Sequence, residues 1–149
     1  MEKVIFIGKT SSGKTTLCQK LNEMDLKYKK TQSVEVYSNA IDTPGEYLEN
    51  RRLYSGIIMS AVDAKVIALV ADPTVEENYI PPSFASTFGK EIIGIITKMN
   101  LVDQKQNLDR ARQVLKNAGV QRIFEVDTVD NVGIEELFQY LDKVLNENT

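Results

Sequence analysis

The stretch Gly8-Lys9-Thr10-Ser11-Ser12-Gly13-Lys14-Thr15 follows directly after the apolar residues 4–7 and matches the phosphate-binding loop pattern GxxxxGK[ST]. Several backbone N–H groups must surround a polyphosphate at once, so such a loop needs glycines where a Cβ would obstruct the approach. Lys14 supplies an ammonium that reaches the outer phosphates, and the hydroxyl of Thr15 is placed to ligate Mg²⁺. The stretch therefore predicts a site for a nucleotide polyphosphate.

The flanking residues provide the strand and the helix that this pattern requires. Residues 3–7 are typical of a buried strand, and apolar side chains recur at helical spacing through residues 16–24. The phosphate would then lie at a helix N-terminus, where the helix dipole favours an anion. We predict that all eight loop residues and Thr16 bind the nucleotide, and we interpret Cys18 as a small apolar helix residue rather than a nucleophile.

Length and composition restrict the other classes of function. A chain of 149 residues predicts one domain over residues 1–149. Its formal net charge of −3, with both signs interspersed, argues against a nucleic-acid or membrane partner. One cysteine and no histidine exclude a disulfide framework, a Cys/His zinc site and histidine acid–base catalysis. Because a strand begins almost at once and no apolar run is long enough to span a bilayer, we expect a cytoplasmic protein.

Strands and helices are predicted to alternate along the rest of the chain. The pattern predicts an α/β fold of the three-layer α/β/α P-loop type, with a mainly parallel sheet of five to six strands and ligands at their carboxyl ends. A D-x-x-Q capping box, Asp103 to Gln106, is expected to begin a helix that ends before Gly119. Further strands are expected at residues 34–37, 40–42, 65–71, 91–97 and 121–126, further helices at 48–62 and 134–145, and a loop with a short helix between 73 and 89.

A second motif, Asp42-Thr43-Pro44-Gly45, follows the short strand at residues 40–42. In this DxxG arrangement the aspartate holds Mg²⁺ through a water, and the glycine N–H approaches a γ-phosphate with no side chain in the way. An isolated DxxG usually marks a turn. The phosphate loop upstream favours the functional interpretation here, with Asp42 as a metal-binding residue and Gly45 as a catalytic one.

The order of phosphate loop, isolated threonine, Asp-Thr-Pro-Gly and Thr-Lys-x-Asn resembles that of small GTPase-like proteins over nearly the whole chain. The segments Lys-Thr-Gln-Ser-Val-Glu at residues 30–35 and Ile-Asp-Thr-Pro-Gly-Glu-Tyr at 41–47, with a short link between them, are similar to the EutP/PduV family of ethanolamine- and propanediol-utilisation proteins. This resemblance does not distinguish the two branches of the family. It implies an association with bacterial microcompartments and their proteins.

The resemblance also implies roles for single residues. Thr31 would be the switch threonine that ligates Mg²⁺ and meets the γ-phosphate. Lys98, beside Thr97, would lay its stem against the purine, and Asn100 would occupy the position where GTPases carry an aspartate. Backbone groups near Asp127, Thr128 and Val129 would approach the base.

Two residues depart from the GTPase pattern. Asn100 offers guanine one neutral acceptor instead of a carboxylate, so GTP/GDP and ATP/ADP both remain open as ligands. Glu46 stands where many small GTPases carry the glutamine that orients the attacking water, and together with Lys14, Thr31 and Gly45 it completes the predicted catalytic set. We expect slow intrinsic hydrolysis.

Arg51 and Arg52 suggest an arginine finger, although the solvated face of the helix at 48–62 is the favoured interpretation. Three functions remain open at this point. The chain is a Mg²⁺-dependent GTPase-like switch, a phosphotransferase of the acetate kinase type that uses an acyl phosphate, or a component that binds nucleotide only as a structural ligand.

Overall fold

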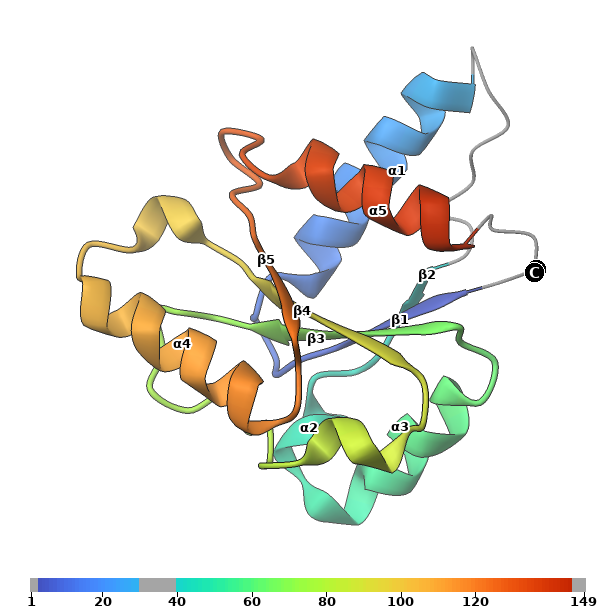
Figure 1. Cartoon of the computed structure of the whole chain (residues 1–149), viewed down its shortest axis with the longest axis vertical. Coiled ribbons are helices and arrows are strands. Elements are labelled where there is room, and N and C mark those ends of the chain that lie inside the picture. Colours follow the sequence, from blue (N-terminus) through green and yellow to red (C-terminus); the bar gives the residue numbers. More distant parts are fainter. Residues whose placement is uncertain (1–2, 30–39, 146–149) are drawn as a thin grey trace.

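A computed structural model describes residues 3–29 and 40–145 of the chain (Figure 1). Its centre is a parallel sheet in the order β2-β1-β3-β4-β5. The strands are β1 (Val4–Ile7), β2 (Ala40–Asp42), β3 (Val66–Ala71), β4 (Glu91–Ile96) and β5 (Arg122–Glu125). The predicted parallel sheet is confirmed, with five strands in the part of the chain that the structure describes; the strand expected at residues 34–37 lies outside it.

Helices cover both faces of this sheet (Figure 1). On one face lie α1 (Lys14–Lys29) and α5 (Ile134–Leu145), and on the other lie α2 (Glu46–Glu49), α3 (Tyr54–Ala61) and α4 (Lys105–Asn117). The predicted three-layer α/β/α fold is therefore confirmed. Among residues 3–29 and 40–145 no helix combines the length and the apolar character that crossing a bilayer requires.

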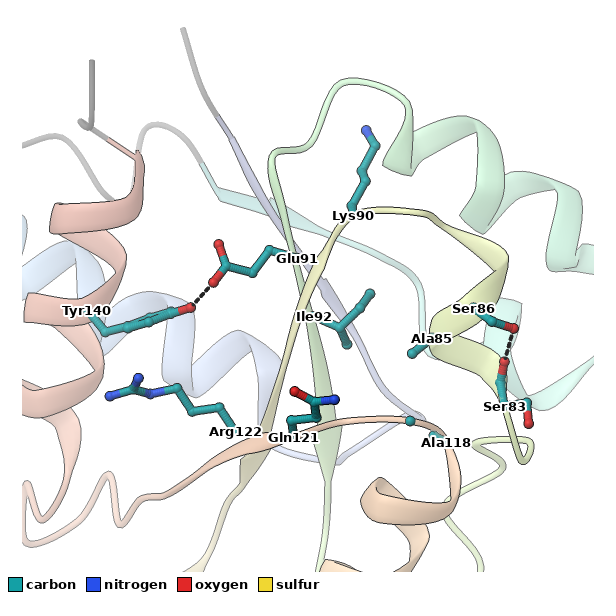
Figure 2. Close-up of a pocket in the computed structure, with 11 residues that line it drawn as sticks. Ser83, Ala85, Ser86, Lys90, Glu91, Ile92, Ala118, Gln121, Arg122 and Tyr140 are labelled. Carbon is teal, nitrogen blue, oxygen red and sulfur yellow. Dashed lines mark hydrogen bonds between the residues drawn. The ribbon is translucent and has the colours of Figure 1, made fainter. Parts of the chain in front are cut away.

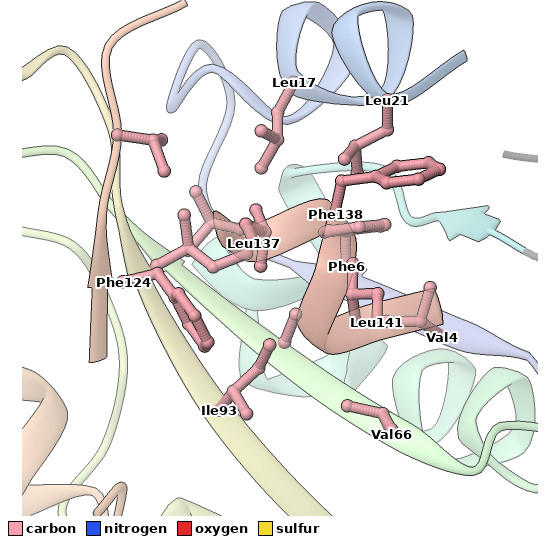
Figure 3. Close-up of a cluster of buried hydrophobic side chains, with 14 of the residues drawn as sticks. Val4, Phe6, Leu17, Leu21, Val66, Ile93, Phe124, Leu137, Phe138 and Leu141 are labelled. Atoms are coloured by element: carbon pink, nitrogen blue, oxygen red, sulfur yellow. The ribbon is translucent and has the colours of Figure 1, made fainter. Parts of the chain in front are cut away.

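Each face of the sheet has its own hydrophobic core. Figure 3 shows the core beneath α1 and α5, where Leu17, Leu21 and Phe138 pack over Val4 and Phe6. The side chains of β1 and β3 are fully buried, which explains why both read as continuous apolar runs rather than as alternating ones. The sheet is thereby a rigid base for the loops that leave its carboxyl ends.

Two local predictions are wrong. The helix expected over residues 48–62 is divided, because Asn50 adopts an extended conformation (φ −127°, ψ 112°) and its side chain accepts a hydrogen bond from the Arg52 N–H at 3.0 Å. A 3₁₀ turn at Arg51–Leu53 then leads into α3. The Asp103 capping box does not form either, since α4 begins at Lys105 after Gln104, with no side-chain cap.

Other boundaries differ by smaller amounts. The first helix continues to Lys29 instead of ending near residue 24. The short helix expected between 73 and 89 is a 3₁₀ turn at Phe84–Thr87, after the two prolines. The helix end before Gly119 is confirmed, and Gly119 adopts the left-handed conformation (φ 102°) expected of that position.

Candidate functional site

The loop between β1 and α1 forms a narrow turn at the carboxyl edge of the sheet. Ser11 (φ 62°) and Gly13 (φ 101°) both have positive φ angles, and the Ser12 N–H closes the turn on the Lys9 carbonyl at 3.2 Å. Such a conformation points successive N–H groups into one concavity, as an anion site requires. A cleft of about 290 Å³ opens here, lined by Ser11, Ser12, Gly13, Lys14, Thr15, Thr16 and Lys98.

Lys14 is the buried cation of this cleft. Its side chain lies over the loop, where Nζ donates to the carbonyls of Gly8 at 2.7 Å and Lys9 at 3.2 Å. Burial lowers the pKa of Lys14, and the negative charge of Asp42 opposes that shift. A phosphate that replaced the two carbonyls would give the ammonium a charged partner.

Thr15 and Asp42 come together although they are far apart in sequence. The Thr15 hydroxyl donates to Asp42 Oδ2 at 3.2 Å, and Asp42 ends β2 beside Phe6 of β1. Next to them the Thr43 hydroxyl donates to the Phe6 carbonyl at 2.8 Å, which ties the DxxG segment to the sheet. A hydroxyl and a carboxylate oxygen are hard ligands of the kind that Mg²⁺ binds, with phosphate oxygens and waters completing the octahedron. The donor set fits the predicted ion.

Not every predicted metal ligand can be placed. Thr31 lies outside the described residues. Within residues 3–29 and 40–145 no group of three or more Cys, Asp or Glu side chains is arranged to hold a metal ion by itself. A cation at Thr15 and Asp42 would thus depend on oxygens of the bound nucleotide.

Gly45 brings the start of α2 against the phosphate loop. A Cβ at this position would lie 2.1 Å from the Thr10 amide nitrogen and 2.6 Å from the Lys9 carbonyl carbon. The close approach of the two backbones therefore requires glycine at this position. The backbone conformation does not, because a φ of −59° suits any residue. The next residue, Glu46, is exposed on the first turn of α2.

Lys98 connects the loop after β4 to both neighbouring loops. Its left-handed backbone (φ 55°) lays the side chain across the phosphate loop, so that Nζ donates to the Ser11 carbonyl at 2.8 Å and to Asp72 Oδ2 at 2.7 Å. Burial by itself would raise the pKa of Asp72, but hydrogen bonds from Lys98 and Thr74 outweigh it and lower that pKa. Lys98 thereby keeps its aliphatic stem beside the cleft.

Thr97 is buried beside the phosphate loop. Its buried hydroxyl donates to the Ser12 carbonyl at 2.6 Å, and its N–H donates to the Ala71 carbonyl at 3.1 Å. The hydrogen bonds of Thr97 therefore hold the phosphate loop against β3 and β4. The Thr97 hydroxyl is thus already bonded to the loop.

The segments predicted to contact the base also lie at this edge. Asn100 is exposed in a 3₁₀ turn at Met99–Leu101, and the Met99 N–H joins this turn to the Val126 carbonyl at 3.2 Å. Asp127 is buried, and its Oδ1 accepts from the N–H groups of Val129 at 2.8 Å and Asp130 at 3.1 Å. The N–H groups of Val129 and Asp130 are thereby used within this loop.

Sequence reasoning missed two acidic residues of the site. Asp72, which is 1% exposed, directly follows the strand predicted at residues 65–71. Its position directly after a buried parallel strand was the signal that could have identified it. Glu49, whose side chain bonds Thr10, carried no such signal. Arg51 and Arg52 are exposed, as expected, but they lie in the 3₁₀ turn at Arg51–Leu53 rather than on the face of a continuous helix.

A cavity larger than this cleft lies elsewhere in the protein. A groove of about 630 Å³ runs along the amino ends of β4 and β5, at the edge opposite the phosphate loop (Figure 2). Its charged groups are engaged within the protein. Lys90 Nζ donates to the carbonyls of Ala61, Val62 and Ala64, and the Tyr140 hydroxyl donates to Glu91. Volume alone therefore does not make this groove the functional site.

Both the sequence and the fold match known proteins. A family model described as "Ethanolamine utilisation - propanediol utilisation", PduV-EutP, matches residues 1–143. The chain belongs to the PduV-EutP family. The resemblance seen at residues 30–35 and 41–47 is thus confirmed.

Two relatives and one solved structure extend this match. "Propanediol utilization protein PduV" of Citrobacter freundii is 37% identical over 142 residues, which cover 95% of this chain and 94% of that protein. "Probable acetate kinase EutP" of Salmonella typhimurium is 31% identical over 144 residues, covering 95% and 89%. The fold is similar to a crystal structure of Aquifex aeolicus Era bound to GDP.AlF4-, with a TM-score of 0.64 and 18% identity, over 100% of this chain and 59% of that chain. The PduV-EutP chain therefore has the P-loop GTPase-like fold.

Proposed function

We propose that this PduV-EutP family member binds a Mg²⁺–nucleotide at the phosphate loop, hydrolyses its triphosphate form slowly and acts as a GTPase-like switch. The observation that carries the proposal is that Lys14, Thr15 and Lys98 line one cleft, with Asp42 bonded to Thr15. The Lys14 ammonium would balance the phosphates, the stem of Lys98 would lie against the base, and the pair at 3.2 Å between Thr15 Oγ1 and Asp42 Oδ2 would hold the metal. The Mg²⁺ ion, when bound, would neutralise charge that develops on the phosphates during transfer.

The base preference is the finer part of this proposal. The relative "GTPase Der" of Campylobacter lari and the Era structure bound to GDP.AlF4- favour guanine. Asn100 weakens that expectation, because a neutral amide replaces a carboxylate that would accept two N–H groups of guanine. We propose GTP and GDP as the ligands, with ATP and ADP as the alternative.

Slow hydrolysis follows from the residue after Gly45. Glu46 is exposed and negatively charged, whereas an amide in this position can both accept from water and donate to phosphate. A carboxylate can only accept while ionised, and it repels the γ-phosphate. We expect turnover well below about 1 s⁻¹ in the absence of a partner, and a faster rate would contradict this part of the proposal.

Competition binding tests the proposal directly. GTP, GDP, ATP and ADP should displace a fluorescent nucleotide from the Mg²⁺-bound wild-type protein, with the guanine nucleotides acting at lower concentration. Lys14→Ala should lose most of this affinity, while Lys116→Ala, the same change at an exposed lysine of α4, should not. Equal affinity for guanine and adenine would remove the GTPase assignment, and no displacement by any nucleotide would refute the site.

A phosphotransferase is the second candidate, because the Salmonella relative is named "Probable acetate kinase EutP". In that reaction a nucleoside diphosphate would take the phosphoryl group of acetyl phosphate and release acetate. Product analysis separates the two candidates. Release of phosphate from the triphosphate in the absence of acetate favours the switch. Consumption of the triphosphate only when acetate is present favours the transferase. Binding of the nucleotide with neither reaction favours a structural ligand. An association with ethanolamine or propanediol microcompartments is proposed from the family alone.

A further inference from the structure

A carboxylate from α2 lies on the phosphate loop. The Thr10 hydroxyl donates to Glu49 Oε2 at 2.6 Å, and the Thr10 N–H makes a longer hydrogen bond to the same oxygen at 3.4 Å. Glu49 is the last residue of α2, and the helix begins where Gly45 touches the Thr10 backbone. The short helix is thus fastened to the loop at both of its ends.

The position of this carboxylate bears on phosphate binding. N–H groups of the loop and the Lys14 ammonium are the groups that a polyphosphate needs. Glu49 already accepts from one of these N–H groups, and its charge acts on Lys14 together with that of Asp42. An anion bound at the Thr10 end of the loop would compete with Glu49 for the same donors and would be repelled by it.

We infer that Glu49 sets the selectivity of the site between nucleoside diphosphates and triphosphates. The contact between Thr10 and Glu49 is compatible with a diphosphate and must open before a terminal phosphate can bind at this end of the loop. Because the ligand and the contact exclude each other, a triphosphate would also release the end of α2. The inference rests on the proposed nucleotide site and adds the residue that couples its occupancy to α2.

A merely structural fastening makes a different prediction. If Glu49 only anchored α2, its loss would lower stability and weaken all phosphate ligands to a similar degree. If it excludes the terminal phosphate, its loss changes the ratio of the two affinities. The ratio of triphosphate to diphosphate affinity is therefore the decisive quantity.

Glu49→Gln removes the charge while preserving the size of the side chain. Asp63→Asn is the matched control, because Asp63 is exposed in the turn before β3, at the opposite edge of the sheet. For wild type and both variants, affinities are measured for GDP and a slowly hydrolysed GTP analogue with Mg²⁺. Pyrophosphate and tripolyphosphate serve as a second pair that is independent of the base.

We expect Glu49→Gln to raise the ratio of triphosphate to diphosphate affinity by about three- to tenfold in both ligand pairs, with less effect at high salt. Thr10→Val, which removes the hydroxyl donor, should shift the ratio in the same direction. Asp63→Asn should leave it within about twofold.

Two results would overturn the inference, and they are distinguishable. Tight binding by the wild type with an unchanged ratio in Glu49→Gln refutes the role of Glu49 and leaves the proposed function intact. Failure of the wild type to bind either nucleotide refutes both. Circular dichroism of Glu49→Gln confirms that an altered ratio comes from a folded protein, as expected for an exposed residue.

Discussion

Lys98→Met breaks the ion pair that joins the loops after β3 and β4. Lys98 Nζ lies 2.7 Å from Asp72 Oδ2 in this pair. The Asp72 side chain is 1% exposed and the Lys98 side chain is 31% exposed. Deleting one partner of a fully buried pair costs about 3–5 kcal/mol. Asp72 keeps two hydrogen bonds from Thr74, and Lys98 is partly solvated, so we expect a smaller loss of about 2 kcal/mol. For a chain of this length that loss lowers Tm by about 4–8 °C.

Urea unfolding at a series of pH values measures this effect. The pKa of Asp72 is lowered in the folded protein, so the pair stabilises the fold fully above the unfolded pKa of about 3.9, and the contribution is lost as the pH falls through the folded pKa. The difference between wild type and Lys98→Met should therefore be constant near neutral pH and shrink below about pH 5, where the unpaired buried carboxyl of the variant takes up a proton.

Two further variants make the test specific. Lys116→Met, at an exposed lysine of α4, should change stability by less than about 0.5 kcal/mol. Adding Asp72→Asn to Lys98→Met should recover much of the loss, since a neutral amide no longer needs the ammonium. A loss of stability that stays the same from pH 7 to pH 3, or that Asp72→Asn fails to relieve, would refute the reasoning.

Three other predictions concern the phosphate loop and the first helix. Gly45→Ala would put a Cβ 2.1 Å from the Thr10 nitrogen, so α2 must shift. We expect at least about tenfold weaker binding of the triphosphate and a smaller change for the diphosphate. Equal losses of the two affinities in a competition assay would contradict this. The Ser12 hydroxyl is buried with no hydrogen-bond partner among the described residues, so Ser12→Ala should raise the free energy of unfolding in urea by about 1 kcal/mol, and a decrease would contradict this. Burial raises the pKa of the Cys18 thiol to about 12, so iodoacetamide at pH 8 should modify the native protein at least about a hundredfold more slowly than the unfolded one, as followed by mass spectrometry.

Local patterns predicted the elements whose signal is contained in a short stretch. The helix at 134–145 was predicted with its bounds because its apolar residues repeat at helical spacing and face one core. The break at Asn50 was missed because a polar residue is compatible with an exposed helical position, and only its capping bond to Arg52 shows that the helix ends there. The Asp103 box failed for a related reason, since a four-residue motif does not determine which residue begins a helix.

The candidate site, like the fold, was predicted from the sequence only where its residues lie in one short stretch. The sequence by itself determined the phosphate loop, since residues 8–15 carry both the glycines and the functional groups of the cradle, and it identified Asp42 and Gly45 by their spacing. Only the tertiary structure decided which acids lie beside that cradle. Asp72 reaches Lys98 across 26 positions, and Glu49 reaches Thr10 across 39. The physical reason is that a parallel sheet collects the carboxyl ends of distant strands at one edge, and no local pattern records which side chains meet there.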